Sequence, residues 1–539
     1  MNSRVALSLL LFAGASAASV PAQEHEHAGA ERLGRVEFPV SCAPEAQRRF
    51  ERAMAVLHSF WWEEGPRAFG AVLKTDSTCA MAHWGLAVNA WGNPFAGGPS
   101  GENLRTGAAE AARAVALGAP TARERGFLAA AATLYRDHDS VPAPTRLRAY
   151  SDTLARMHRD YSADPEVALY YALSLVATAS PTDTTFTRQK QAAAILNPLF
   201  VRYPNHPGLA HYIIHANDSP RLANLGLDAA RRYATIAPDA PHAQHMPSHI
   251  FVRLGLWDEA VESNRRSYAA GVRYAQEQGL TGVNYHEFHA MDYMVYGYLQ
   301  QGRDSAARAM VAKGLAITEV RSPSPLLGSY NRIAMEARLP LERGDWRAAA
   351  RLPVRKPDVP VSEMLSRFAR GVGAARLPEP TQLGQDVEAL QRIEQVLANG
   401  NDSYWSRIAG IKRQALHAWV VLASGDTTEA LREAKAAAEL EDGTEKPPVT
   451  PGELIPAREL EADMHLLAGH YGAARDAYLE TLKREPGRAR SVFGAARAAE
   501  LGGDRALAAA GYRDYLRLME RADASRGEIR TARAGAGKQ

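Results

Sequence analysis

The sequence lacks the short motifs by which several large enzyme classes are recognised. It contains no HExxH zinc motif, no glycine-rich phosphate loop and no nucleophile elbow with a serine–histidine–aspartate arrangement. The missing HExxH argues against a zincin-type protease, because that motif places two histidine ligands and a catalytic glutamate on one helix. No strand-rich segment is evident either, so any function has to be sought on helices.

The chain also lacks an excess of charge of one sign and long apolar runs. Its 63 Lys and Arg residues nearly balance its 60 Asp and Glu residues, which gives a formal net charge of +3. So small and dispersed a charge gives no reason to expect a nucleic-acid partner. No stretch past the N-terminus reaches the roughly 18 apolar residues that a membrane-spanning helix needs, so we expect no membrane span.

Cysteine is scarce as well, since only Cys42 and Cys79 occur. Neither lies in a nucleophile motif, which argues against a catalytic cysteine. Residues 1–22 resemble a cleaved signal peptide, with Arg4, a short apolar run and small residues for cleavage. We therefore expect a periplasmic or secreted protein, in which an even pair of cysteines forms a disulfide; two buried thiols are the alternative.

Histidine, in contrast, is concentrated between residues 206 and 292. His211 and His245 are 34 residues apart, and so are His215 and His249. A turn of the form Gly-x-aromatic-x-x-Ala recurs as well. Its copies are Gly255 with Trp257 and Ala260, Gly344 with Trp346 and Ala349, and Gly469 with Tyr471 and Ala474.

By this period and this turn the chain resembles the tetratricopeptide-repeat (TPR) family, whose units are helix–turn–helix pairs of 34 residues. The resemblance implies an all-α fold, a TPR-like α-solenoid in which antiparallel helix pairs form a right-handed superhelix. It also implies that certain positions of the first helix of each pair, helix A, face a concave groove, the usual place for a protein or peptide ligand. The HMPSHI element at residues 245–250 resembles that of exported bacterial TPR proteins, which implies no particular activity.

Proline-rich stretches divide the expected array. We expect a flexible N-terminal segment at 23–43, a first TPR-like array with the histidine-rich groove at 44–320 and middle helical repeats at 326–441. A C-terminal pair of repeats is expected at 457–523 and a disordered tail at 524–539. The stretches 352–361 and 442–456 are expected to be a linker and a break in the array.

In the repeat register, seven side chains fall on groove-facing positions of three successive A helices. They are His211, His215, His242, His245, His249, His289 and Asp292. Residues three or four apart share a helix face, and packed helices lie about 8–10 Å apart, a gap that two histidines and a metal ion can bridge. Histidine and carboxylate without thiolate suit Zn, Cu or Fe.

Two classes of function remain open on this evidence. The first is an exported TPR-repeat binding protein whose groove carries a histidine and aspartate cluster that binds a transition metal. The second is a metal-dependent enzyme, a hydrolase or oxidoreductase, with Glu287 as the candidate base. Without a metal, the groove would bind a peptide or an anion, or the imidazoles would only pack. His206 and His286 are weaker candidates, and His58, as a lone histidine, is more typical of a structural role.

Overall fold

The computed structural model describes residues 31–355, 358–380, 382–523 and 526–537. The chain divides into a short unit, Met1–Glu31, and a compact unit, Arg32–Gln539, which contains every element described below. The signal peptide expected at residues 1–22 lies outside the described residues. So do residues 23–30 of the expected flexible segment.

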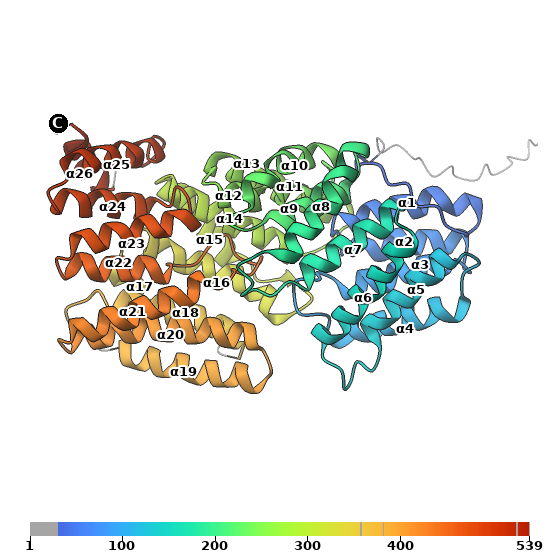
Figure 1. The fold of residues 1–539 in the computed structure, drawn as a ribbon, viewed down its shortest axis with the longest axis horizontal. Coiled ribbons are helices and arrows are strands. Elements are labelled where there is room, and N and C mark those ends of the chain that lie inside the picture. Colours follow the sequence, from blue (N-terminus) through green and yellow to red (C-terminus); the bar gives the residue numbers. More distant parts are fainter. Residues whose placement is uncertain (1–30, 356–357, 381, 524–525, 538–539) are drawn as a thin grey trace, which may run out of the picture. The chain divides into compact units, whose positions relative to one another are not determined.

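Helices form nearly all of the regular structure in the described residues, so the all-α prediction is confirmed (Figure 1). The exception is a two-residue parallel pairing of β1 (Val283–Asn284) with β2 (Val320–Arg321). The N-terminal helices are α1 (Pro44–His58), α2 (Gly65–Thr75), α3 (Ala80–Trp91), α4 (Gly101–Leu117), α5 (Ala122–Tyr135), α6 (Ala143–Asp160), α7 (Pro165–Ala177) and α8 (Thr187–Arg202).

The histidine-rich region forms the helices in the middle of the chain, drawn mostly in green in Figure 1. They are α9 (Pro207–Asn217), α10 (Ala223–Ile236), α11 (Pro241–His245), α12 (Pro247–Arg253), α13 (Trp257–Glu277), α14 (Tyr285–Gln300) and α15 (Asp304–Ala316). The remaining helices are α16 (Pro325–Glu342), α17 (Trp346–Ala350), α18 (Pro360–Ala374), α19 (Leu383–Asn399), α20 (Ser403–Ala423), α21 (Thr427–Asp442), α22 (Ala457–Leu467), α23 (Tyr471–Arg484), α24 (Ala489–Leu501), α25 (Arg505–Leu518) and α26 (Gly527–Ala536).

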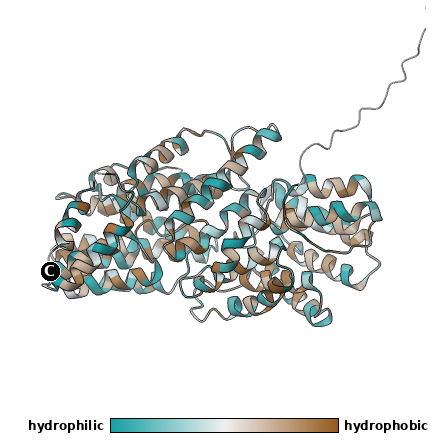
Figure 2. Ribbon diagram, turned by 90° about the horizontal axis from the view of Figure 1, so that it is seen from above, coloured by the Kyte–Doolittle hydropathy of each residue, from teal (hydrophilic) through white to brown (hydrophobic). Residues whose placement is uncertain are grey.

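Most helices pack against their neighbours in the chain, as the repeat pattern predicts. The turn between α12 and α13 shows why the repeat turn has its sequence. Gly255 has a φ of +68°, a conformation that glycine adopts without steric penalty, and Trp257 then starts α13. Ala260 is fully buried, so a small side chain is required there. Hydrophobic and hydrophilic residues alternate along most helices, which is typical of helices with one buried face (Figure 2).

Both ends of the described chain are more ordered than the sequence suggests. Residues 32–43 contain no helix, but Leu33, Val36 and Phe38 are buried. This part of the expected flexible segment therefore packs against the core. In the expected disordered tail, residues 527–536 form α26, which buries Ile529 and Ala532. Burial of apolar side chains offsets the entropy lost when such a segment becomes ordered.

Two further features of the chain bear on the site. Cys42 and Cys79 form the expected disulfide. The stretch expected to be a break at 442–456 packs inside the molecule, where Thr450, Leu454 and Ile455 are buried. Within the described ranges, no helix is both long and apolar enough to cross a membrane.

Candidate metal centre

The helix that should carry the HMPSHI element is broken at its proline. Helix α11 ends at His245 and α12 begins at Pro247, with Met246 between them. Proline causes this break because it has no amide hydrogen for the helical bond and its ring clashes with the preceding turn. The ring centres of His245 and His249, on either side of this break, lie 4.9 Å apart.

Six of the seven predicted site residues come together in two groups of three. Within each group the ligand nitrogens all lie within 4.8 Å of one another. The first triad is His211, His215 and His242, and the second triad is His245, His249 and His289. The two triads adjoin, since the ring centres of His242 and His245 are 5.7 Å apart and those of His215 and His249 are 6.1 Å apart.

Hydrogen bonds behind the rings fix the orientation of three of these histidines. His211 Nδ1 lies 2.6 Å from the carbonyl oxygen of His58, and His245 Nδ1 lies 2.6 Å from Asn264 Oδ1. His249 Nδ1 lies 2.8 Å from a carboxylate oxygen of Asp218. All three partners are acceptors, so each Nδ1 carries the hydrogen and donates it. A neutral imidazole has only one N–H, which leaves each Nε2 with a bare lone pair.

The amide of Asn264 is itself oriented by the fold. Its Nδ2 donates to the carbonyl of Ala260 at 2.7 Å, so Oδ1 is the atom that faces His245. Outer hydrogen bonds of this kind are the usual support of histidine ligands in metal sites, because they fix the tautomer and raise the basicity of the coordinating nitrogen.

In the second triad, two of these bare Nε2 lone pairs lie close together. His245 Nε2 and His249 Nε2 lie 3.0 Å apart, and neither has a hydrogen to donate to the other. The Tyr293 hydroxyl is 3.4 Å from His249 Nε2, longer than a usual O–H hydrogen bond. Burial lowers the pKa of both imidazoles, His249 despite the neighbouring Asp218, so an added proton between them is disfavoured. A cation about 2.0–2.1 Å from both nitrogens would remove the repulsion.

The first triad also contains a close pair of Nε2 atoms, but here one ring can change its tautomer. His211 Nε2 and His215 Nε2 lie 3.1 Å apart, and the tautomer of His215 with its hydrogen on Nε2 would satisfy this pair. His242 is buried, yet neither of its ring nitrogens has a hydrogen-bond partner among the described residues. Buried polar groups without a partner are uncommon in native proteins, so His242 also has the properties expected of a ligand.

A third group of buried ligand-type residues differs in how its facing atoms are paired. His58 Nε2 and His206 Nε2 lie 3.0 and 2.9 Å from the two carboxylate oxygens of Glu166. Burial alone would raise the pKa of Glu166, but the two imidazoles hold it well below its usual range. Each ring can donate one hydrogen to the carboxylate, so the atoms that face one another in this group are paired without a metal, although His206 Nδ1, on the far side of its ring, has no hydrogen-bond partner among the described residues. Sequence reasoning did not find Glu166, which lies on α7 with no motif around it.

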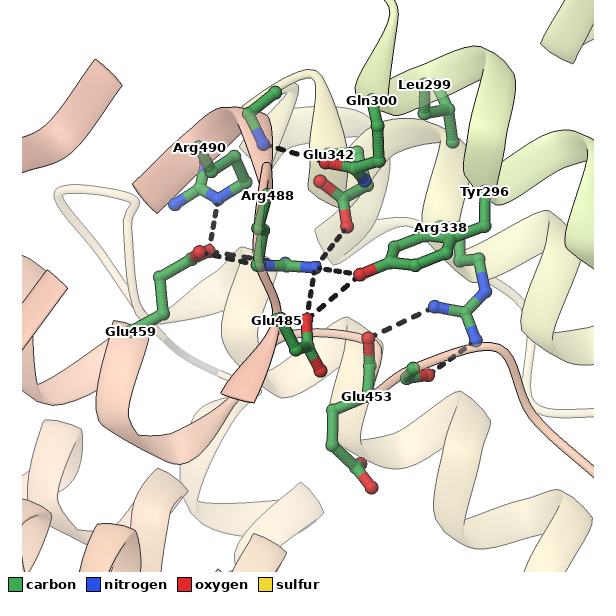
Figure 3. Close-up of polar contacts among 12 residues, drawn as sticks. Tyr296, Leu299, Gln300, Arg338, Glu342, Glu453, Glu459, Glu485, Arg488 and Arg490 are labelled. Carbon is green, nitrogen blue, oxygen red and sulfur yellow. Dashed lines mark hydrogen bonds and ion pairs between the residues drawn. The ribbon is translucent and has the colours of Figure 1, made fainter. Parts of the chain in front are cut away.

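Asp292 does not join either triad. Its Oδ1 accepts from Arg338 Nε at 2.9 Å, and both side chains are fully buried. Arg338 contacts Asp292, Thr450 and the backbone of residues 452 and 453 (part of this network is drawn in Figure 3). Asp292 Oδ2 is buried without a hydrogen-bond partner among the described residues, so its role as a metal ligand stays a prediction. The groove position was assigned from the repeat register, which does not reveal an arginine on a neighbouring helix.

Glu287 lies outside both triads. Its side chain lies against Gly271 of α13, where a Cβ on that glycine would meet Glu287 Cγ at 2.8 Å. Residues 287 and 289 are two positions apart on α14, and residues so spaced do not share a helix face. Burial raises the pKa of Glu287 to about 7. The candidate base for an enzyme thus has a suitable pKa but is not among the residues gathered in the triads.

The residues that support the triads were largely invisible in the sequence. Asp218 follows the HYIIHAN stretch directly and was a reachable candidate. Asn264 lies 19 residues after His245, on the partner helix α13, where nothing marks it. Glu445 and Lys446 come from the stretch expected to be a break, yet both line a cavity beside the histidines. Glu445 also pairs with Arg253.

No protein-family model matches the chain, and no curated protein matches it. Similar solved structures include a human IFIT1 dimer with m7Gppp-AAAA (11% identity, 81% of this chain and 87% of that one, TM-score 0.34). Others are the P58(IPK) TPR domain (14%, 69% and 97%, 0.20) and yeast Tom70 (11%, 91% and 95%, 0.28). At these scores the similarities say nothing about function.

Proposed function

We propose that this protein is a TPR-like repeat protein that binds transition-metal ions through its two histidine triads. The observation that carries the proposal is the pair His245 and His249, whose Nε2 atoms face each other at 3.0 Å while both Nδ1 hydrogens are donated elsewhere. Neutral imidazole is the commonest metal ligand in proteins. A metal ion turns this repulsive pair into two bonds.

The donor set narrows the choice of metal. Six imidazoles without thiolate suit Zn, Cu, Ni or Fe and argue against Mg and Ca, which prefer oxygen ligands. The three metals expected from the sequence, Zn, Cu and Fe, therefore remain candidates. Three histidines in each triad leave a coordination position open, as in catalytic zinc sites rather than closed structural ones.

We propose a metal rather than a peptide as the ligand of the histidine face, because the chain's own 442–456 segment lines the cavity into which that face opens. Lys446, Pro447 and Val449 line the same cavity as His242 and His249. An extended peptide would have to displace this segment.

We also propose that the protein is exported to the periplasm or secreted. The signal-like sequence at residues 1–22 supports this, and so does the disulfide between Cys42 and Cys79, because disulfides persist in oxidising compartments.

Elemental analysis of tag-free protein, with exchange into Zn, Cu, Fe and Mn, tests the metal proposal. We expect up to two ions per chain, one for each triad. His245→Ala should remove the ion of the second triad while circular dichroism stays helical. His465→Ala is the matched control, because His465 lies on α22, outside both triads. A protein that carries none of the four metals after desalting would refute the proposal.

A further inference from the structure

A cavity of about 610 Å³ adjoins both triads. Its lining includes His215 and His242 of the first triad and His249 and His289 of the second triad. The volume falls in the range of about 300–1,000 Å³ that is usual for small-molecule sites. The open coordination positions of bound metals would therefore face a space large enough for an organic ligand.

We propose that this cavity binds a small organic molecule. The molecule would have an apolar body about the size of an aromatic ring and an anionic oxygen group that coordinates the metal. The inference rests on the proposed metal binding and adds the class of molecule that the site would take.

Part of the remaining lining, the apolar wall, fits an apolar body. It includes Val176 at the end of α7, Leu327 on α16, Val449 of the 442–456 segment, and the rings of Phe95, Tyr404 and Trp405, of which Phe95 packs on His215 with ring centres 4.4 Å apart. Aromatic and aliphatic side chains at several points around one cavity are the usual lining of sites for apolar ligands. A fully polar ligand such as a sugar would leave much of this wall without partners.

The charges in the lining favour an anion at the metal end. Lys446 lines the cavity and donates one hydrogen bond, at 2.9 Å, to the carbonyl of Thr450. The two acids in the lining have partners of their own, since Glu445 pairs with Arg253 and Asp402 caps α20 through the amide of Trp405. Metal cations held by neutral imidazoles would add positive charge beside Lys446, so an oxygen anion would be attracted to this end.

The experiment uses the full chain loaded with Co²⁺, whose visible absorption reports on its ligands. Titration with 4-phenylbutyrate should change the cobalt spectrum and saturate, because the carboxylate enters the open position while the phenyl group occupies the cavity. Acetate should bind at least tenfold more weakly, because it lacks the apolar body. The alcohol 4-phenylbutanol should leave the spectrum nearly unchanged.

A variant that fills the cavity isolates the apolar wall. Val176→Trp should bind as much cobalt as the wild type but should weaken 4-phenylbutyrate at least tenfold. Leu327→Trp fills the cavity from another helix and replaces it if Val176→Trp does not fold. Val201→Trp is the matched control, because Val201 is 83% exposed, and it should bind the probe like the wild type.

The outcomes separate this inference from the proposal on which it rests. If cobalt binds but 4-phenylbutyrate has no effect, or acetate binds equally well, the inference is overturned and metal binding stands. Unchanged probe binding in both cavity-filling variants overturns it too, since the molecule then binds elsewhere. If no metal binds at all, both fall.

Discussion

Arg338 and Asp292 form a buried ion pair in which Arg338 Nε lies 2.9 Å from Asp292 Oδ1. The same guanidinium donates to Thr450 Oγ1 and to the carbonyl of Gly452, both at 2.7 Å. One arginine therefore joins α14 and α16 to the 442–456 segment that forms a wall of the cavity. The residue chosen from the sequence as a metal ligand helps to hold that wall in place.

Asp292→Asn should lower the stability of the protein without removing metal. Breaking a buried ion pair by removing one partner typically costs about 3–5 kcal/mol, because the other charge is left buried and unpaired. We expect a lower free energy of unfolding in urea and a metal content equal to that of the wild type. Asp228→Asn, on an exposed carboxylate, serves as the control. A folded Asp292→Asn protein without metal would show that Asp292 is a ligand.

The sequence predicted the fold and the histidine cluster for reasons that are local. The period that relates His211 to His245 is a property of the chain, and residues at equivalent places in adjacent repeats necessarily come together. The ion pair of Asp292 was not predicted because its partner, Arg338, lies 46 residues further on, and no local pattern links the two. Asn264 was missed for the same reason.

The sequence also did not predict how the segment that contains Lys446 packs. Its prolines correctly exclude a helix, but they do not say whether the chain runs over the surface or inward. That depends on buried partners such as Arg338 and Arg253, which come from distant helices. Long-range polar contacts of this kind set the shape of the cavity, and a single sequence does not show them.

Asn264→Leu should weaken the metal at the second triad without touching a ligand. Leucine has nearly the shape of asparagine but cannot accept the hydrogen of His245 Nδ1, so the tautomer and ring orientation lose their support. Loss of such an outer partner commonly reduces metal affinity about 10–100-fold. Competition with a chromophoric chelator measures it. Affinity equal to that of the wild type would show that Asn264 does not orient His245.

Glu287→Gln should stabilise the metal-free protein more at high pH than at low pH. Burial raises the folded-state pKa of Glu287 to about 7, so its contribution to stability is complete below the unfolded-state value of about 4.3 and is lost as the pH rises through 7. The variant has no such loss. The difference in free energy of unfolding between variant and wild type should grow by up to about 3 kcal/mol from pH 4 to pH 8.5. A constant difference would contradict the raised pKa.

The disulfide should contribute substantially to the stability of the N-terminal helices. Cys42 and Cys79 are 37 residues apart in sequence, and closing a loop of this size is worth about 3–4 kcal/mol in the chain-entropy model. A Cys42→Ser and Cys79→Ser double variant should therefore unfold at lower urea concentration than the wild type. Denatured, unreduced wild-type protein should show almost no free thiol. Two free thiols per chain would remove the disulfide from the account.

Glu166→Gln distinguishes a hydrogen-bonded histidine cluster from a metal site. Glu166 accepts from both His58 and His206, and a glutamine has only one oxygen to accept while its amide nitrogen faces the other ring. We expect a loss of stability, because a buried hydrogen bond to a charged acceptor is worth about 1.5–3 kcal/mol. The metal content should not change, because the carboxylate already accepts from the Nε2 atoms of both rings. His249→Ala should show the opposite pattern, with metal lost and helix content retained. If Glu166→Gln also loses an ion, the group of His58, Glu166 and His206 is a metal site as well, and bare Nε2 lone pairs are not what marks the binding histidines in this protein.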